Sequence, residues 1–551
     1  MNNKSVWLLI GILVIAAVLR FWQLGSTPPS LDWDEASLGY NAYSLLQTGK
    51  DEYGKPFPII LQSFGDYKPA LYSYLAMPTV ALFGLHTFAL RLPSAIFGVL
   101  TILAVYFLVK ELLKRRDIAL LSALLLAISP WHIQFSRVAF ETNIGVALSV
   151  FAVLFFIYGL QKHMFLIACA FCLGLGLYAY QSEKVFVPLL FLVLIGVYFK
   201  KVRAIPVKYL AGAIAIGLLV ALPMGFSVLT DTNTLGRAKG VSIFGQQSSE
   251  FDYNTQKLTR DHQTNDTIGL VLDNRRVFYA KQVIGNYLSH FDVNWLFVKG
   301  DIGRHHAPGM GLLYLIELPF LLIGIYELCF GRYPRSVKFL LGLWLLIAPL
   351  PASVTTGVPH AVRSYHMVPV IIILVAFGLI AVVRWVEKMK EFRMGYSFLS
   401  LKHFLFSVLI LLYCANIFYY LNQYFIQMNY FSSQDWQYGY QQAAAKVADL
   451  EPRYKKIVVS NAGYLDQSYI FYLFFLKVPP RQYQQQMSFI NNSTTDRKFG
   501  KFEVRKIDWT KDKLEPGVLY VGMPDEFDST SLELDTINFL NNKPAIKIVG
   551  T

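Results

Sequence analysis

The sequence carries little charge for its length. Only 16% of its 551 residues are charged, while 54% are hydrophobic and the mean hydropathy is +0.41. Soluble domains usually carry about 25% charged residues, so this composition excludes an ordinary soluble protein. Apolar stretches recur from residue 6 to residue 424, and about 20 such residues suffice to cross a bilayer. We predict a polytopic α-helical membrane protein.

Cysteines, a cleavable leader and internal repeats are scarce or missing. The four cysteines lie in or beside apolar stretches, and Cys169 and Cys172 have no second pair to complete a zinc site. We therefore expect no disulfide and no cysteine-bound metal. No small-residue cleavage site follows residues 6–18, which predicts a retained first span. An inverted-repeat transporter gains no support, because no internal repeat is evident.

The distribution of basic residues sets the predicted topology. Eleven spans are expected, at residues 6–22, 92–110, 117–130, 144–160, 164–180, 184–199, 208–229, 309–329, 338–352, 364–383 and 403–424. Residues 70–84 are also apolar, and counting them as an interfacial helix rather than a span puts the basic clusters on one side. These clusters contain Lys110, Lys114, Arg115, Arg116, Lys200, Lys201, Arg203, Lys208, Arg332, Arg335, Lys338, Arg384, Lys388, Lys390, Arg393 and Lys402. The positive-inside rule then predicts a multi-pass protein of the cell membrane with a cytoplasmic N-terminus.

Three long segments are predicted outside the cytoplasm: loop 23–91, loop 230–308 and tail 425–551. The tail follows a transmembrane domain of residues 1–424 and contains strand-like runs at 456–461, 517–522 and 545–549. It is expected to be a small extracytoplasmic α/β domain. Loop 230–308 is long and polar, so it is expected to cover a site or to select an acceptor.

The first outer loop holds an acidic motif. Asp32, Asp34 and Glu35 lie in the stretch LDWDEASLGY, and the pattern predicts a helix over residues 35–46 with Asp34 as its N-cap. In the simplest interpretation Asp34 only caps this helix and the acids are solvated. Their position at the mouth of a membrane bundle favours a catalytic role instead.

Two basic residues follow the acids along this loop. Lys68 precedes Pro69 at the foot of the apolar segment, where it either reaches lipid headgroups or binds the phosphate of a lipid-linked substrate. Arg91 opens the second span as an ordinary interface anchor or as the partner of a carboxylate, for which Glu35 is the obvious candidate.

Other outer residues are candidates for supporting roles. Arg137 and Glu141 stand four residues apart and can pair with each other. Arg363 is the preferred second phosphate ligand, since it lies at a membrane boundary. His305, His306 and His360 raise the question of a metal. Because we see no carboxylate at ligand spacing, we assign no metal ligand and expect these histidines to bind anionic phosphate or to line the acceptor cleft.

The order of these motifs resembles one known superfamily. The acidic pair, then KPALY, then RLPSAIFG, is similar to the protein O-mannosyltransferases and aminoarabinose transferases, including bacterial dolichyl-phosphate-mannose-protein mannosyltransferase-like proteins. The clear match covers residues 6 to about 110. The resemblance implies a GT-C type fold, a catalytic Asp34 with Glu35 as its paired acid, and Lys68 and Arg91 as donor-binding residues. Many bacterial relatives have a glutamate before the lysine, where this chain has Tyr67. That departure leaves no firm cofactor, although a divalent metal stays open.

The resemblance also implies a reaction. A sugar would pass from a polyprenyl-phosphate donor to a hydroxyl of a protein, lipid or glycan acceptor, with Asp34 as general base and inversion at the anomeric carbon. The net charge of +14 then reflects topology and an anionic lipid-linked substrate rather than nucleic acid. Two alternatives remain, a transporter or flippase for a lipid-linked glycan and an inactive GT-C-fold subunit of an envelope-assembly complex. The near absence of charge within the spans disfavours the first.

Overall fold

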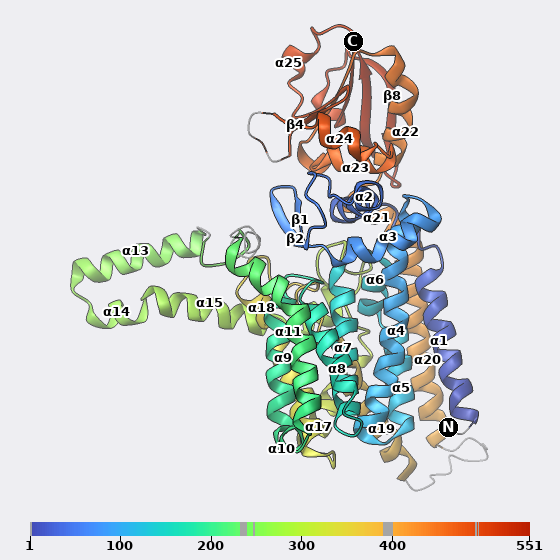
Figure 1. The fold of residues 1–551 in the computed structure, drawn as a ribbon, viewed down its shortest axis with the longest axis vertical. Helices are drawn as coiled ribbons and strands as arrows, with labels where there is room; N and C mark the ends of the chain where they lie inside the picture. Colours follow the sequence, from blue (N-terminus) through green and yellow to red (C-terminus); the bar gives the residue numbers. More distant parts are fainter. Residues whose placement is uncertain (1–2, 232–239, 246–247, 389–400, 491–492, 494) are drawn as a thin grey trace.

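The computed structural model describes all residues except 1–2, 232–239, 246–247, 389–400, 491–492 and 494. A bundle of long helices stands below a smaller domain formed by the C-terminal part of the chain (Figure 1). We call the end of the bundle that faces this domain its upper end. The bundle helices are α1 (Asn3–Phe21), α4 (Thr87–Leu113), α5 (Arg116–Ile128), α7 (Glu141–Gly159), α8 (Phe165–Gly176), α9 (Glu183–Val197), α11 (Val207–Thr230), α16 (Glu317–Phe330), α17 (Arg335–Ile347), α19 (Met367–Lys388) and α20 (Leu401–Asn422).

Each of the eleven predicted spans coincides with one of these helices. Among the described residues, seven helices are both long and apolar enough to cross a membrane. An eighth results if α5 and α6 (Pro130–Arg137), which meet at 58°, form one broken span. The chain is therefore a multi-pass membrane protein, while the count of eleven stays a prediction. The predicted span 309–329 begins later than expected, because α16 starts only at Glu317.

Several spans contain proline, as Pro93 in α4 and Pro188 in α9 illustrate. Proline is tolerated inside membrane helices because neighbouring helices satisfy the freed backbone groups. The four cysteines are free, and Cys169 and Cys172 are buried.

The basic connections between helices lie at one end of the bundle. The N-terminus, α10 (Phe199–Arg203) and the start of α17 are at the end opposite the C-terminal domain (Figure 1). This arrangement agrees with the asymmetry on which the topology prediction rests. Lys390 and Arg393, which also entered that prediction, lie outside the described residues.

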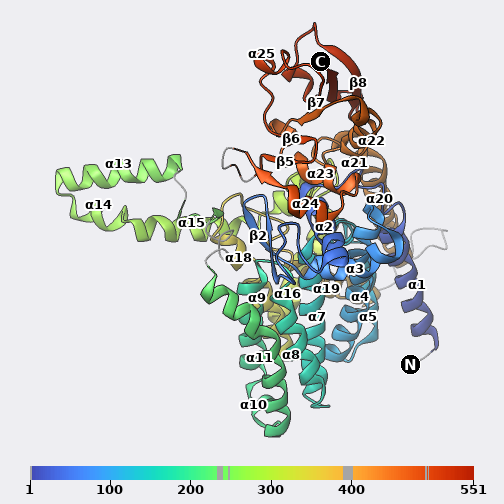
Figure 2. The same ribbon diagram turned by 45° about the horizontal axis from the view of Figure 1, so that its top comes forward.

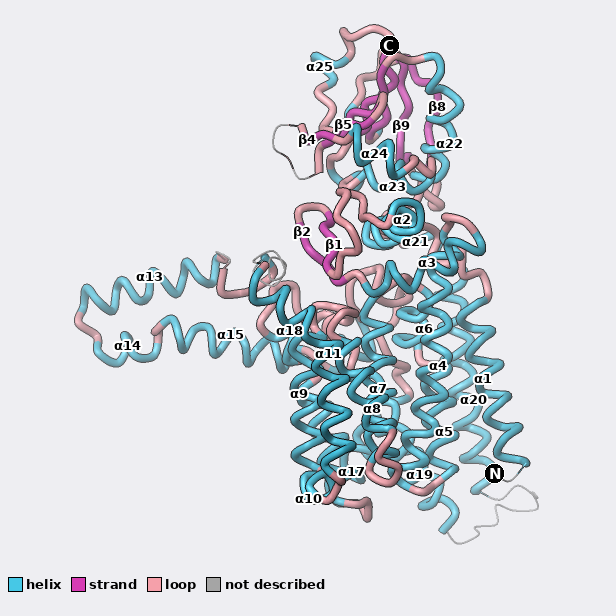
Figure 3. The backbone as a smooth tube through the Cα atoms, viewed as in Figure 1, coloured by secondary structure: helices cyan, strands magenta, loops and turns pink. Residues whose placement is uncertain are grey.

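The first long loop folds into a small layer on the upper end of the bundle. It contains α2 (Trp33–Thr48), the antiparallel hairpin of β1 (Ile60–Ser63) and β2 (Asp66–Pro69), and α3 (Leu71–Phe83). The predicted interfacial helix 70–84 corresponds to α3, which packs against α2 and α4. Figure 3 shows the hairpin beside α2, between the bundle and the C-terminal domain.

The second long loop forms a helical projection. It contains α13 (Ser249–Thr264), α14 (Thr267–Leu272) and α15 (Arg275–Ser289), followed by a short π-helical segment, Trp295–Lys299. Figures 1 and 2 show these helices extending sideways from the bundle. A short helix, α18 (Leu350–Ser353), packs against α15 at its base.

The C-terminal domain is built on one seven-stranded sheet with the order β4-β5-β6-β3-β7-β9-β8. Its central strand β3 is parallel to both of its neighbours, and the other pairings are antiparallel. The strands are β3 (Lys456–Val459), β4 (Ser488–Phe489), β5 (Arg497–Phe499), β6 (Phe502–Val504), β7 (Val518–Gly522), β8 (Leu532–Asn538) and β9 (Pro544–Gly550), and the main helices are α22 (Tyr440–Leu450), α23 (Ser468–Phe475), α24 (Pro480–Gln486) and α25 (Trp509–Asp512). All three predicted strands are confirmed. The helix that precedes the domain continues through α21 (Met428–Phe431), beyond the boundary expected at residue 425.

The domain rests directly on α2. Gly39 allows this approach, because a Cβ atom there would come within 2.5 Å of the Phe474 ring. The hydroxyl of Tyr40 donates a hydrogen bond to the carbonyl oxygen of Val478 at 3.0 Å. At the start of the helix, the backbone N–H of Trp33 donates to the side-chain oxygen of Gln437 at 3.1 Å. The sheet domain and the acidic motif thus share one helix.

A buried charge pair lies where the domain meets the first loop. Arg497 is fully buried, and its guanidinium lies 3.5 Å from the ring centroid of Tyr469. The carboxylate of Glu52 is also fully buried, 4.0 Å from Arg497 Nη1, and neither oxygen has a hydrogen-bond partner among the described residues. Burial therefore outweighs the nearby cation and raises the pKa of Glu52 to about 7 from its usual 4.5.

This shift predicts a pH dependence of stability. The folded protein binds the Glu52 proton more tightly than the unfolded chain does, so the contribution is complete below about pH 4.5 and is lost as the pH rises through about 7. We expect Glu52→Gln to match the wild type in Tm at pH 5 and to exceed it at pH 8. Thermal unfolding of the purified protein at both values checks this. A Tm difference independent of pH would contradict it.

Candidate active site at the upper end of the bundle

The first turn of α2 carries the acidic motif, but Asp32 rather than Asp34 is its N-cap. Asp32 Oδ1 accepts a hydrogen bond from the backbone N–H of Glu35 at 2.8 Å, and the Glu35 side chain reaches back to the backbone N–H of Asp32. This is a capping box. The prediction that Asp34 caps the helix is therefore wrong, and the helix begins at Trp33. The carboxylate of Asp34 is left available for other contacts.

Asp34 pairs with Lys68. The Lys68 ammonium lies 2.6 Å from Asp34 Oδ1, and the two side chains are 3% and 32% exposed. Lys68 belongs to β2, and Gln181 next to the start of α9 donates a hydrogen bond to the carbonyl oxygen of the adjacent Tyr67 at 2.8 Å. A buried cation thus faces a carboxylate that solvent can still reach.

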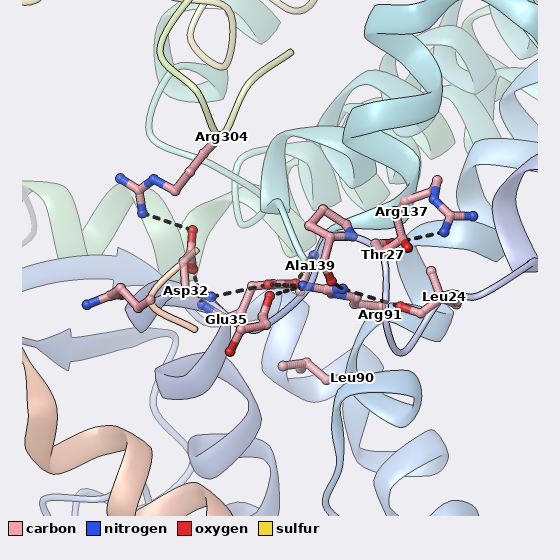
Figure 4. A network of polar contacts seen from close by, with 12 residues as sticks. Leu24, Thr27, Asp32, Glu35, Leu90, Arg91, Arg137, Ala139 and Arg304 are labelled. Carbon is pink, nitrogen blue, oxygen red and sulfur yellow. Dashed lines mark hydrogen bonds and ion pairs between the residues drawn. The ribbon is translucent and has the colours of Figure 1, made fainter. Parts of the chain in front are cut away.

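Glu35 has a different environment from its neighbour. It is fully buried, and Arg91 donates to both of its oxygens, from Nε at 2.9 Å and from Nη2 at 2.8 Å. The backbone N–H of Ala139 adds a third hydrogen bond at 2.8 Å. The predicted pairing of Glu35 with Arg91 is confirmed, and Figure 4 shows both at the centre of a polar network.

Arg91 is committed to this network. Besides Glu35, it donates to the carbonyl oxygens of Leu24, Pro28 and Ser30, and none of its side chain is exposed. These contacts tie the end of α1 and the start of α2 to α4. The role of Arg91 as a phosphate ligand stays a prediction.

Arg304 approaches the motif from the second long loop. Its Nη1 lies 3.2 Å from Asp32 Oδ2 (Figure 4). Its guanidinium also stacks over the Trp33 ring, 4.2 Å from the ring centroid. Burial raises the pKa of Asp32 to about 6, against the opposing charge of Arg304. The ion pair and the stacking contact of Arg304 fix the cap of α2 to the loop that contains His305 and His306.

Asp301 and His305, which flank Arg304 in the chain, form with His360 a cluster suited to a divalent cation. His305 Nδ1 lies 3.0 Å from Asp301 Oδ2, and one ligand atom each from Asp301, His305 and His360 all lie within 4.8 Å of one another. A metal with bonds of about 2.0–2.2 Å would require at most about 4.4 Å between ligands, so only a small contraction is needed. Burial opposes ionisation of Asp301, yet the hydrogen bond from His305 and the nearby imidazoles lower its pKa to about 2. Such a carboxylate is in its ligating form.

The remaining predicted residues lie in separate environments. Arg363 Nη1 donates to Thr355 Oγ1 and to the carbonyl oxygen of Thr356, both at 2.7 Å. His306 Nδ1 contacts the carbonyl oxygen of Ala307. The Nη atoms of Arg137 donate to the carbonyl oxygens of Leu19 and Arg20 in α1 and of Gln23 and Thr27 just beyond it. Glu141 is buried at the start of α7, and its pairing with Arg137 stays a prediction.

Sequence reasoning overlooked three residues of this region. Asp301 stands four residues before His305, a spacing that was visible in the sequence and that supplies the carboxylate thought to be missing. Arg304 and Gln181 contact the site only through the tertiary fold. No local pattern marks either of them.

The arrangement has a definite chemical capacity. A partly exposed carboxylate can accept a proton when it stands within hydrogen-bond reach of a substrate hydroxyl. A buried ammonium can bind an anionic leaving group, and its charge acts more strongly there than in water. Asp34 and Lys68 place these two functions side by side at the upper end of a membrane bundle.

Comparison with known proteins supports the fold. A family model for dolichyl-phosphate-mannose-protein mannosyltransferase matches residues 67–226. ArnT from Cupriavidus metallidurans in the apo state aligns with a TM-score of 0.56 at 12% identity, over 100% of this chain and 98% of that one. The same enzyme bound to undecaprenyl phosphate aligns with a TM-score of 0.53, at the same identity and coverage.

A third solved structure is more distant. The oligosaccharyltransferase of Archaeoglobus fulgidus, tethered to an acceptor peptide, aligns with a TM-score of 0.50 at 14% identity over 86% of this chain and 63% of that one. No curated protein sequence matches this chain. The resemblance inferred from the sequence is confirmed at the level of the fold. The chain is therefore a membrane protein of the GT-C glycosyltransferase fold class, with a segment at residues 67–226 that matches the dolichyl-phosphate-mannose-protein mannosyltransferase family.

Proposed function

We propose that this protein is a membrane glycosyltransferase that moves a hexose or pentose from a polyprenyl-phosphate donor to an acceptor hydroxyl. The 2.6 Å pair of Asp34 and Lys68 carries the proposal. It combines a proton acceptor with a phosphate-binding cation at the upper end of a GT-C bundle. We further propose that this end faces away from the cytoplasm, as the distribution of basic residues predicts.

The proposed reaction is a single displacement. The acceptor oxygen attacks the anomeric carbon while the bond from that carbon to the donor phosphate breaks. Asp34 takes the proton of the acceptor hydroxyl, and the electron pair of the broken bond stays on the phosphate. Lys68 neutralises this phosphate. A divalent cation held by Asp301, His305 and His360 would supply further positive charge for an anionic substrate.

The polyprenyl tail needs an apolar path beside this site. A groove of about 580 Å³ lies between α9 and α17 and is lined by Leu189, Leu192, Val193, Gly196, Val197, Phe339, Leu343 and Ile347. Gln181, close to the upper end of α9, contacts the strand that bears Lys68. We assign the tail to this groove because its lining is apolar and because α9, which forms one of its walls, begins two residues after Gln181.

The positions of two buried acids favour a glycosyltransferase over a transporter. Glu183 is the first residue of α9 and pairs with His366 at 2.7 Å, and Glu317 is the first residue of α16. Transport pathways instead place ionisable residues within the spans. An inactive subunit would need neither a proton acceptor nor a phosphate-binding cation.

Substitution of Lys68 tests the proposal. We expect Lys68→Ala to raise the KM for the lipid-linked donor about 10- to 100-fold, because a hydrogen bond to a charged group is worth about 1.5–3 kcal/mol. Asp34 is partly exposed, so water can solvate it in the variant. Transfer from radiolabelled polyprenyl-phosphate mannose, glucose, arabinose and aminoarabinose is measured in proteoliposomes.

Two variants sharpen this test. Lys68→Arg keeps the charge and should retain part of the affinity for the donor, whereas Lys299→Ala removes an exposed lysine of the second long loop and should change nothing. An unchanged donor KM in Lys68→Ala would remove the phosphate role. Absence of transfer from every donor by the wild type would favour the inactive subunit.

A further inference from the structure

The projection formed by α13, α14 and α15, residues 249–289, has no assigned role in the proposed reaction. We call it the arm. Figures 1 and 2 show it extending sideways from the upper end of the bundle, with α14 and α15 below α13 and therefore nearer to the level of the spans (Figure 1).

The arm is a packed unit. The guanidinium of Arg275 lies 3.7 Å from the centroid of the Phe251 ring, and the same side chain donates to Asn254 and Thr255 of α13. In return, Asn254 Nδ2 donates to the carbonyl oxygen of Asp273 at 2.9 Å. The orientation of α13 relative to α15 is therefore fixed.

The base of the arm is bonded to the upper ends of the bundle helices. Tyr287 of α15 donates its hydroxyl hydrogen to the carbonyl oxygen of Leu346 in α17 at 2.9 Å. One residue earlier, Asn286 Nδ2 donates to the carbonyl oxygens of Ser353 and Thr355 at 3.1 and 3.3 Å. The last turns of α15 therefore lie at the level where α17 ends.

One face of α14 and α15 is apolar and uncovered. Its members are 56–72% exposed and are Ile268, Val271, Leu272, Ile284 and Leu288. In α15 the exposed residues Arg276, Ala280, Ile284 and Leu288 follow one another at four-residue intervals, which places them along a single side of the helix. Contiguous exposed apolar surface of this kind marks a contact with a partner or a membrane.

At its base the arm meets an exposed apolar residue of the bundle. Leu346, whose carbonyl receives the Tyr287 bond, is itself 51% exposed at the upper end of α17. The charges of the arm are also unevenly distributed. Within their helical bounds α14 and α15 contain Arg275, Arg276 and Lys281 but no acid, and Asp266 and Asp273 cap the two ends of α14. The acids within α13 are Glu250, Asp252 and Asp261, beside Lys257 and Arg260.

We propose that the arm lies in the membrane interface beside the bundle, with the apolar face of α14 and α15 in the lipid and α13 in water. The partner is the bilayer surface, with anionic headgroups beside Arg276 and Lys281. An amphipathic helix with an apolar face and basic flanks binds such a surface. The fixed packing of α13 on α15 then keeps the acids of α13 away from the headgroups.

Fluorescence quenching in lipid nanodiscs with one chain per disc tests this arrangement. The exposed Cys329 and Cys414 are replaced by serine, and the buried Cys169 and Cys172 stay. Single cysteines at Leu272 and at Ile284 carry an environment-sensitive label. A matched control label sits at Gln256, which is exposed on α13. The discs contain phosphatidylcholine with or without phosphatidylglycerol, and quenching by nitroxide lipids is compared with quenching by iodide.

Labels at positions 272 and 284 are expected to be quenched at least fivefold more by nitroxide lipids than the label at 256. Iodide, in contrast, should quench the label at 256 more than the labels at 272 and 284. Phosphatidylglycerol should increase the lipid quenching of both. Equal iodide quenching at all three positions would overturn the proposal, because the face would then be in water. Protection of positions 272 and 284 from both quenchers would also overturn it, since protein rather than lipid would cover the face.

Discussion

Asp34→Asn is expected to lower the rate of sugar transfer by about 10²- to 10⁴-fold, the range typical of a lost general base. The amide keeps the shape of the side chain but cannot accept the proton of the acceptor hydroxyl. Lys68 keeps its ammonium in this variant and can still bind the donor phosphate. The loss should therefore appear in kcat, with little change in the KM for the donor.

The measurement compares single-turnover transfer in proteoliposomes at matched protein content. Asp292→Asn serves as the control, because Asp292 is an exposed aspartate of the second long loop whose side chain accepts a hydrogen bond from the backbone N–H of Asn294. It should retain full activity. Near-normal transfer by Asp34→Asn would remove Asp34 as the base, whatever the result for Lys68.

Arg91→Met is expected to destabilise the fold by about 3–5 kcal/mol, the cost of removing one partner of a buried ion pair. Glu35 has no exposed surface, so its carboxylate would keep only backbone donors such as Ala139. The carbonyl oxygens of Leu24, Pro28 and Ser30 would also lose their donor. We expect a sharp fall in Tm and in the amount of monodisperse protein after extraction.

The double variant Glu35→Gln with Arg91→Met separates this explanation from a catalytic one. It leaves no buried charge and should recover part of the Tm. Arg304→Met is the matched control, since the Arg304 side chain is 17% exposed and its 3.2 Å ion pair with Asp32 is longer than the 2.8 Å pair of the fully buried Arg91 with Glu35. A normal Tm for Arg91→Met would show that the Glu35 pair does not hold the first loop.

The positions of the spans and of three strands could be predicted because hydropathy and alternation are local properties. Every predicted span overlaps a helix, and the runs at 456–461, 517–522 and 545–549 overlap β3, β7 and β9. The helical arm was harder to foresee. Its sequence is polar and its helices depend on caps at Ser248, Asp266 and Asn274 rather than on long apolar runs.

For the candidate site too, part could be predicted from the sequence and part could not. The pairing of Glu35 with Arg91 was expected from the sequence, but the identity of the helix cap was not. Asp32 and Asp34 are equally good caps by residue type, and only the spacing to Glu35 favours Asp32. Arg304 lies 272 residues from Asp32, and no local pattern could indicate a contact over that separation.

The contact between Asp34 and Lys68 has a consequence for the order of events. While the ammonium occupies Asp34 Oδ1 at 2.6 Å, the carboxylate has less capacity to accept a proton from an incoming hydroxyl. A donor phosphate competes for the same ammonium and, on binding, releases the carboxylate. In the proposed reaction, the acceptor hydroxyl would therefore be activated only after the lipid-linked sugar has bound Lys68.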